Sequence, residues 1–309
     1  MAKNTNLTEK FKELGLGTKR VETDRFIGKD GRFNVVRRGI GLRGFSLYHW
    51  LINMSWSRFF LFVTVSYLMV NVFFASVYLF VGVDKLTGFD ENSLHPFSHC
   101  FFFSAQTLTT VGYGHISPLG PITSFIAAIE AMIGLLGFAF ATGILYGRFS
   151  KARSKILFSK NLLLSPYKGG KGLKFRIANM RESQLIDMQA RLMYSFLHEE
   201  NGETKRRYLS LDLEVDFINL FPLPWTIVHP LDEKSPLFGK GVMDLTEQKS
   251  EFLIILKGFD DTFNQYIHQI HEYNHDEVVF DSDFLPMFDP SAGGRTEVHL
   301  DLISQYRKI

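Results

Sequence analysis

Two long runs of apolar residues dominate the first half of the chain. Residues 59–83 form a run of 25 positions without a charged side chain, and residues 121–147 form a run of 27 with Glu130 as the only charge. A helix needs about 20 apolar residues to cross a bilayer, so both runs predict membrane-spanning helices. The first run begins after 58 residues and is longer than the apolar core of a signal sequence, so we expect both helices to be retained.

A third apolar run lies between the two spans and is too short to cross a bilayer. Residues 96–109 cover 14 positions, which predicts a re-entrant helix. Just before the first span, apolar residues recur every three or four positions among polar ones, at Leu47, Trp50, Leu51 and Met54. This spacing predicts an interfacial helix over residues 46–57, or else the polar beginning of the first span.

The second half of the chain changes to a period of two. Over residues 209–216 apolar and polar residues alternate, which predicts a half-buried strand. Similar short runs, separated by segments rich in Gly, Pro, Asn and Asp, lie at residues 173–178, 190–197, 225–229, 252–257 and 277–280. We therefore expect a β-sandwich in the second half of the chain.

The distribution of basic residues orients the two spans. Residues 1–58 carry twelve Lys and Arg and residues 148–160 carry five without an acid, whereas residues 84–120 carry one. Basic flanks favour the cytoplasm, so both termini are expected there. The predicted parts are a cytoplasmic N-terminal segment (1–45), an interfacial helix (46–57), a transmembrane pore domain (58–149) and a cytoplasmic domain (150–309). The formal net charge of +2 gives no reason to expect nucleic acid as a partner, and Cys100, the single cysteine, excludes an intrachain disulfide.

The five residues after the re-entrant run carry the chemistry. They are Thr110, Val111, Gly112, Tyr113 and Gly114, the TVGYG sequence of potassium filters. Potassium loses its water only where oxygens replace it, and glycines let successive carbonyls face one axis. The first four residues are therefore the expected K⁺ ligands, and the Val111 and Tyr113 side chains are expected to point into supporting protein. One loop is part of a ring, so we expect a homotetramer.

The filter and four further segments resemble the inward-rectifier potassium channels, and the prokaryotic branch most of all. The further segments are residues 25–32, 50–56, 143–149 and 232–238. The resemblance covers nearly the whole chain. It implies a membrane α-helical pore domain with two transmembrane helices and a re-entrant pore helix, followed by a cytoplasmic immunoglobulin-like β-sandwich domain. It also implies passive potassium conduction without enzymatic activity, in a bacterial plasma (inner) membrane.

Glu130 is the acid within the second span. A carboxylate at mid-membrane costs about 2.5–3.5 kcal/mol on insertion scales unless it faces water or a partner, so we expect it to face the central cavity. The resemblance assigns Glu130 to control of rectification, with Mg²⁺ or polyamines as blockers. The alternative is a structural acid paired with a buried polar group.

Three other residues of the second span are candidates for gating. Gly134 matches the hinge of the family, although a small residue also serves close helix packing. Tyr146 lies 16 residues after Glu130, about 24 Å along a helix, and matches the bulky residue that narrows the inner mouth. Phe138 is a second candidate constriction or a packing residue.

A basic cluster follows the second span. In the family this region binds anionic phospholipid, which would involve Arg148, Lys151, Arg153 and Lys155, with Trp56 and Arg58 from the interfacial helix. The same charges also serve to set topology alone. Farther along, Asp261, Glu199, Glu200 and Glu203 are candidates to line a cytoplasmic pore, or else form a solvated acidic face.

The chain departs from the family around the filter. Gln106 stands where members usually carry a glutamate, and Ile116 stands where animal members carry its arginine partner, so the supporting ion pair is absent. His115 follows the filter where many potassium channels carry an aspartate.

Other function classes fit less well. A potassium channel of another class, gated by a soluble cytoplasmic ligand, would call for a phosphate-binding loop, and residues 169–172 lack its spacing. An enzyme would need a converging nucleophile, base or metal site, and no such constellation occurs in the sequence.

Overall fold

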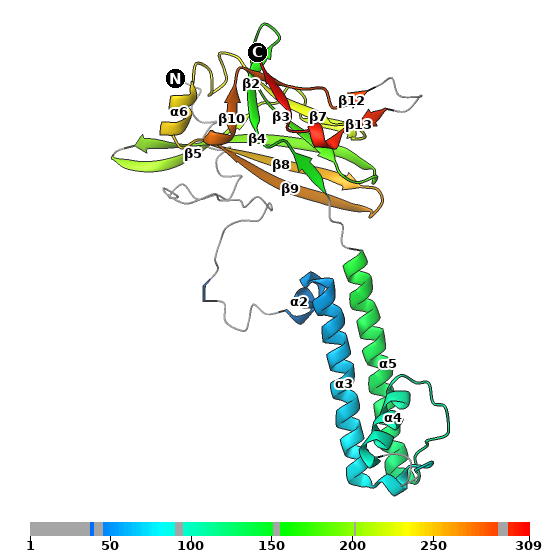
Figure 1. Cartoon of the computed structure of the whole chain (residues 1–309). Helices are drawn as coiled ribbons and strands as arrows, with labels where there is room; N and C mark the ends of the chain where they lie inside the picture. The colour runs from blue at the N-terminus through cyan, green and yellow to red at the C-terminus, as the bar shows by residue number, and fades with distance from the viewer. Residues whose placement is uncertain (1–37, 40–45, 90–94, 151–154, 201, 290–295) are drawn as a thin grey trace. The chain divides into compact units, whose positions relative to one another are not determined.

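The computed structural model describes residues 38–39, 46–89, 95–150, 155–200, 202–289 and 296–309, apart from the Glu200 side chain. The chain divides into a helical unit within residues 39–151 and a β-rich unit within residues 152–309, and each is treated by itself (Figure 1). Two of the described helices are long and apolar enough to cross a membrane. Most of the predicted segment 1–45 lies outside the described residues.

The helical unit follows the predicted order of elements. Its described helices are α2 (Leu47–Asn53), α3 (Trp56–Val81), the 3-10 turn η2 (Val83–Lys85), α4 (Pro96–Leu108) and α5 (Pro121–Phe149). α3 and α5 correspond to the two predicted spans, and the 29 residues of α5 extend roughly 43 Å at the usual rise of a helix. α4 corresponds to the re-entrant helix and packs against both α3 and α5 (Figure 1).

The interfacial helix α2 is shorter than predicted. It starts where the Ser46 hydroxyl accepts a hydrogen bond from a backbone N–H of the first turn. Met54 and Ser55 are extended, and α3 begins at Trp56. The prediction that Trp56 belongs to the interfacial helix is therefore wrong, because two extended residues separate α2 from α3.

The β-rich unit contains two five-stranded sheets in its described part. The first has the order β1-β3-β2-β10, with β7 also paired to β3, and the second has the order β5-β4-β8-β9, with β6 also paired to β4. Their strands are β1 (Ile156–Phe158), β2 (Leu162–Tyr167), β3 (Gly170–Asn179), β4 (Leu185–Glu200), β5 (Glu203–Leu211), β6 (Phe217–Leu220), β7 (Trp225–Leu231), β8 (Glu251–Asp260), β9 (Gln265–Asn274) and β10 (Val278–Phe280). The remaining elements are α6 (Val242–Glu247), η3 (His275–Glu277), β11 (Ser282–Phe284), β12 (Phe288–Asp289), β13 (Glu297–Val298), η4 (Leu300–Leu302) and β14 (Tyr306–Lys308).

The two sheets share one apolar core. Alternate side chains of β3, β4 and β8 point into it, and Phe175, Tyr194 and Phe252 from these strands are fully buried. Successive residues of a strand face opposite sides, so one apolar face of each sheet covers the other. This packing confirms the predicted β-sandwich (Figure 1).

The alternating run at residues 209–216 is a strand only in its first part. β5 ends at Leu211, and beyond it the backbone N–H of Glu214 donates to a carbonyl of β7. The carbonyl of Asp216 accepts from Ala190 on β4. The prediction of one continuous strand is wrong, because the backbone of this segment pairs with two other strands.

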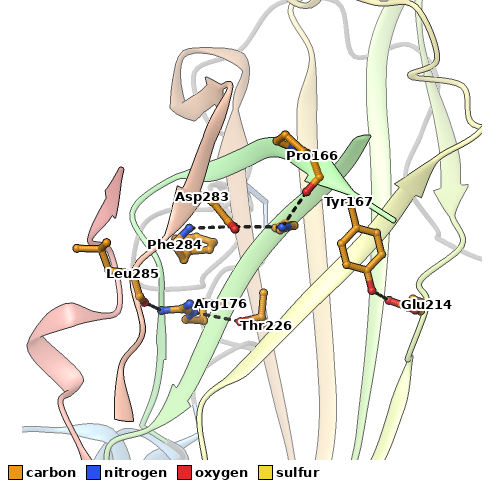
Figure 2. Close-up of polar contacts among 9 residues, drawn as sticks. Pro166, Tyr167, Arg176, Glu214, Thr226, Asp283, Phe284 and Leu285 are labelled. Atoms are coloured by element: carbon orange, nitrogen blue, oxygen red, sulfur yellow. Dashed lines mark hydrogen bonds and ion pairs between the residues drawn. The ribbon is translucent and has the colours of Figure 1, made fainter. Parts of the chain in front are cut away.

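A short C-terminal strand, β11, covers two buried cations on β3. Lys174 and Arg176 lie on the face of β3 that points away from the core, yet they are 7% and 9% exposed. Figure 2 shows the residues that cover them. Lys174 Nζ forms an ion pair with Asp283 Oδ1 at 3.1 Å, and Arg176 donates to the Leu285 carbonyl at 2.7 Å and lies 4.6 Å from the Phe284 ring centroid. Removing β11 would leave two buried charges uncompensated, so this strand is integral to the sandwich.

His229 on β7 is a buried titratable group. Its Nδ1 lies 2.7 Å from the Asp212 carbonyl oxygen and its Nε2 lies 2.8 Å from the Ser235 hydroxyl. Burial lowers the pKa of His229, and the hydrogen bond to the Asp212 carbonyl opposes this shift in part. The folded state therefore binds this proton more weakly than the unfolded state does.

We expect the His229 contribution to stability to be complete above a pH of about 6.5, the ordinary pKa of histidine, and to be lost progressively as the pH falls below that value toward the lowered pKa of the folded state. The His229→Gln variant should show a smaller loss of stability in acid. His268→Gln, at an exposed position, should retain the dependence of the native chain. Thermal unfolding of the full chain in detergent across this pH range measures both, and an unchanged slope in His229→Gln would contradict the assignment.

Candidate functional site

The loop after α4 has an unusual backbone conformation. Thr110, Gly112 and Gly114 have φ angles of 61°, 55° and 86°, whereas Val111 and Tyr113 between them are not in the left-handed region. Residues in the left-handed region therefore alternate with residues outside it along this loop. A positive φ is a strained conformation for a β-branched residue such as Thr110, and strain of this kind accumulates at functional sites.

The pore helix α4 holds the start of this loop. The Gln106 carbonyl accepts hydrogen bonds from the N–H groups of Val111 at 2.9 Å and Gly112 at 3.3 Å, and the Thr107 carbonyl accepts one from Thr110 at 3.0 Å. These carbonyls lie in the last turn of α4, where four backbone acceptors lack helical partners. The N–H groups of the loop therefore pair with the free carbonyls at the end of α4.

Gln106 also holds the far side of the loop. Its Nε2 donates to the Ile116 carbonyl at 3.2 Å, and both residues are buried. At these two positions the resemblance led us to note the absence of a glutamate–arginine ion pair. A neutral hydrogen bond from a side chain to the backbone joins the same two positions.

The outer loop encloses the filter from the other side. Thr87 N–H donates to the Ser117 carbonyl at 2.9 Å, and Ser117 N–H donates to the Thr87 hydroxyl at 2.7 Å. Leu119 N–H donates to the Lys85 carbonyl at 2.8 Å. The chain that leaves the filter is thus hydrogen-bonded to the segment that follows α3.

Two side chains of the predicted filter have little cover from their own chain. Val111 is 53% exposed and Tyr113 is 77% exposed. The described part of this chain therefore does not supply the protein expected to surround these two side chains.

The Glu130 side chain does not face a cavity, in contrast to the prediction. Its side chain is fully buried between α3, α4 and α5, with Oε2 accepting from the Tyr78 hydroxyl at 2.6 Å and Oε1 lying 2.5 Å from Ser104 Oγ. A groove of 680 Å³ is lined by Thr110 and Phe138, among others, and Glu130 is not part of its lining. The prediction that Glu130 faces the cavity is contradicted, because its carboxyl is enclosed by polar partners of its own chain. Its predicted control of rectification stays a prediction.

Gly134 serves close packing. A Cβ atom at this position would lie 1.9 Å from the Leu108 carbonyl oxygen, in the last turn of α4. The absence of a side chain thus allows α5 to approach the helix that carries the filter. The predicted hinge at the same position stays a prediction.

Arg148 is engaged inside the subunit, which contradicts its predicted contact with lipid. It is 9% exposed, and its guanidinium donates to the carbonyls of Leu51 at 2.5 Å, Ile52 at 3.2 Å and Met54 at 2.8 Å. These carbonyls end α2, where a cation is also favoured by the helix dipole. The Arg148 guanidinium lies 4.5 Å from the Trp56 ring centroid, so the Trp56 ring packs against this arginine. Arg148 therefore joins the end of α5 to the end of α2.

The other predicted lipid residues have different positions. Arg58 and Lys155 are exposed, so burial does not prevent either side chain from contacting a lipid headgroup. Lys151 and Arg153 lie outside the described residues. Lipid binding at these four positions stays a prediction.

The predicted gate residues are both exposed on the subunit. Phe138 and Tyr146 are each 74% exposed on α5. The acids predicted to line a cytoplasmic pore lie in two places. Asp261 follows β8, whereas Glu199 and Glu203 lie near the opposite end of β4. Of Glu200 only the backbone is described. Asp261 therefore does not lie in one cluster with Glu199 and Glu203.

Comparisons with known proteins agree with this arrangement of elements. The inward rectifier potassium channel C-terminal domain family matches residues 156–309, and the ion channel family matches residues 65–151. The inward rectifier potassium channel Kirbac3.1 of Paramagnetospirillum magnetotacticum is 35% identical over 280 residues, which cover 89% of this chain and 93% of that protein.

Two animal proteins are more distant. The G protein-activated inward rectifier potassium channel 1 of Gallus gallus is 27% identical over 89% of this chain, and that of Bos taurus is 26% identical over 87%. The chain spans 60% and 58% of the lengths of these two relatives.

The contact of Arg148 with α2 leads to a stability prediction. Arg148→Met should lower the free energy of unfolding by about 2–4 kcal/mol, because it leaves buried carbonyls without a charged donor. Arg58→Met, at an exposed position in the first turn of α3, should change the free energy of unfolding by less than about 0.5 kcal/mol. Thermal unfolding in detergent compares the two variants, and equal losses would contradict the role assigned to Arg148.

Gly134 and Gly137 form a matched pair on α5. Gly134→Ala should destabilise the chain by about 1–3 kcal/mol, since the new methyl group must displace the backbone at Leu108. A Cβ at Gly137 meets nothing within 4 Å, so Gly137→Ala should be tolerated. Thermal midpoints of the two variants in the same detergent test this, and a tolerated Gly134→Ala would argue against the packing role.

Proposed function

This chain belongs to the inward rectifier potassium channel family, and on that premise we propose that residues 110–114 form the selectivity filter of a homotetramer that conducts K⁺ passively. The observation that carries the proposal is the alternation of φ angles at Thr110, Gly112 and Gly114, in a loop anchored to α4. Successive carbonyls turned to one side can replace the water of K⁺. Thr110, Val111, Gly112 and Tyr113 would supply these carbonyls.

The exposed filter side chains support assembly of several copies. Val111 and Tyr113 leave large apolar and aromatic surfaces on the subunit, and a filter at membrane depth tolerates such irregular backbone only when protein surrounds it. Neighbouring copies around a fourfold axis would provide that protein. Sequence similarity to a bacterial channel supports a bacterial inner membrane as the location.

Gating and regulation belong to the proposal as well. Tyr146 would narrow the inner mouth, with Phe138 as a second constriction, and Arg58, Lys151, Arg153 and Lys155 would meet anionic phospholipid. Block by Mg²⁺ or polyamines has no site on α5 in this proposal, because Glu130 is the only acid of that helix and is enclosed.

A substitution at Gly112 tests the filter directly. An L-residue pays roughly 1–2 kcal/mol for the left-handed conformation, so Gly112→Ala should reorient a carbonyl and lower potassium-over-sodium selectivity by at least about tenfold. Gly169→Ala is the matched control, since Gly169 also has a positive φ, of 80°, but lies between β2 and β3. It should keep native selectivity.

The measurement is potassium and sodium flux through purified protein in liposomes, with and without external barium. Selective, barium-sensitive flux in the native chain and in Gly169→Ala, lost in Gly112→Ala, is the expected result. Unselective flux that survives Gly112→Ala would refute the filter assignment.

A further inference from the structure

Four polar side chains meet inside the helical unit, where α3, α4 and α5 pack together. Asn71 and Tyr78 come from α3, Ser104 from α4 and Glu130 from α5, and all four are 0% exposed. Three oxygen-to-oxygen contacts join them. Tyr78 to Glu130 Oε2 measures 2.6 Å, Ser104 to Glu130 Oε1 measures 2.5 Å, and Ser104 to Asn71 Oδ1 measures 3.0 Å.

The amide of Asn71 has a defined orientation. Its Nδ2 donates to the carbonyl of Tyr67, one turn earlier in α3, at 2.8 Å. A rotated amide would place its oxygen against that carbonyl oxygen, which repels it. Oδ1 therefore faces Ser104 and can only accept a hydrogen bond.

Counting protons decides what Glu130 must contribute. Each of the three contacts joins two oxygen atoms and needs one proton between them. The hydroxyl groups of Tyr78 and Ser104 supply one proton each, and the Asn71 oxygen supplies none. With an ionised Glu130, one contact would bring two acceptor oxygens together without a proton.

A single arrangement satisfies all three contacts. Tyr78 donates to Oε2 of Glu130, the Glu130 carboxyl donates through Oε1 to Ser104, and Ser104 donates to Asn71. The chain of hydrogen bonds then continues from Asn71 to the Tyr67 carbonyl. Reversing the bond to Tyr78 would again leave one proton for the two contacts of Ser104.

We propose that Glu130 is a neutral carboxylic acid that donates its proton to Ser104 and so positions α4 between α3 and α5. Burial favours the same state, since no Lys or Arg of the described residues forms an ion pair with Glu130 and a lone buried carboxylate is costly. The side chains that contact the Glu130 carboxyl, Tyr78 on α3 and Ser104 on α4, carry no positive charge.

The location gives this hydrogen-bonded chain its role. Ser104 lies two residues before Gln106, whose carbonyl accepts hydrogen bonds from the N–H groups of Val111 and Gly112. Glu130 is thus a positioning residue for the helix that carries the filter. This role rests on the proposed function, whereas the protonation of Glu130 does not.

Infrared absorption tests the protonation without reference to conduction. Full-length native protein in liposomes at neutral pH should show the carbonyl stretch of a protonated carboxylic acid, and the difference spectrum against Glu130→Gln should contain that band. A difference spectrum that shows only a carboxylate band would overturn the proposal. The outcome is independent of whether the filter conducts potassium.

Flux measurements test the positioning role. Glu130→Gln keeps a donor toward Ser104 and an acceptor toward Tyr78, so its selective flux should stay within about twofold of the native chain. Ser104→Ala breaks two buried contacts and should lose at least about tenfold. Ser76→Ala is the control, because that hydroxyl bonds only to its own helix, at the Val72 carbonyl. A loss in Glu130→Gln as large as in Ser104→Ala would show that a charged carboxylate is required and would overturn the proposal.

Discussion

Backbone groups inside a bilayer must find partners within the protein, and this constraint explains most of the helical unit. The loop after α4 has given up helical hydrogen bonds, so other groups must replace them. Gln106 supplies a carbonyl acceptor on one side of the loop and an amide donor on the other. Through Thr87 and Ser117 the outer loop closes the remaining side. The strained conformation at Thr110 is kept because these partners hold both its ends.

The same requirement recurs at the end of α2. There the chain turns through two extended residues, which leaves carbonyls of the last turn without helical partners. Arg148 on α5 donates to these carbonyls, although it lies 94 to 97 positions later in the sequence. In the β-rich unit the strands pair their backbone groups with one another, and the groups that need partners are the buried cations. Lys174 pairs with Asp283 on β11, and Arg176 donates to the carbonyl of Leu285, the residue after β11. In both cases a segment distant in the sequence supplies the partners of a buried charge.

Sequence periodicity predicted the helices and the two-layer sandwich because both follow from the spacing of apolar residues. It did not predict the surroundings of Glu130 and Arg148, because the spacing of residues along one helix does not show which residues of other helices they contact. The partners of Glu130, Tyr78 and Ser104, were visible in the sequence only as ordinary members of apolar runs. A hydroxyl or amide recurring in each of three apolar segments was the available signal. The alternation that runs past Leu211 likewise could not reveal that two other strands compete for the same backbone.

The exposed faces of Val111 and Tyr113 have a consequence for inheritance. In the proposed tetramer each copy completes the surroundings of its neighbours' filters, so a copy that folds but carries a faulty filter would still enter the assembly. One such copy would disable the pore built with three intact ones. Defects in the filter should therefore be genetically dominant, whereas defects that prevent a subunit from folding should be recessive, because those copies never reach the assembly.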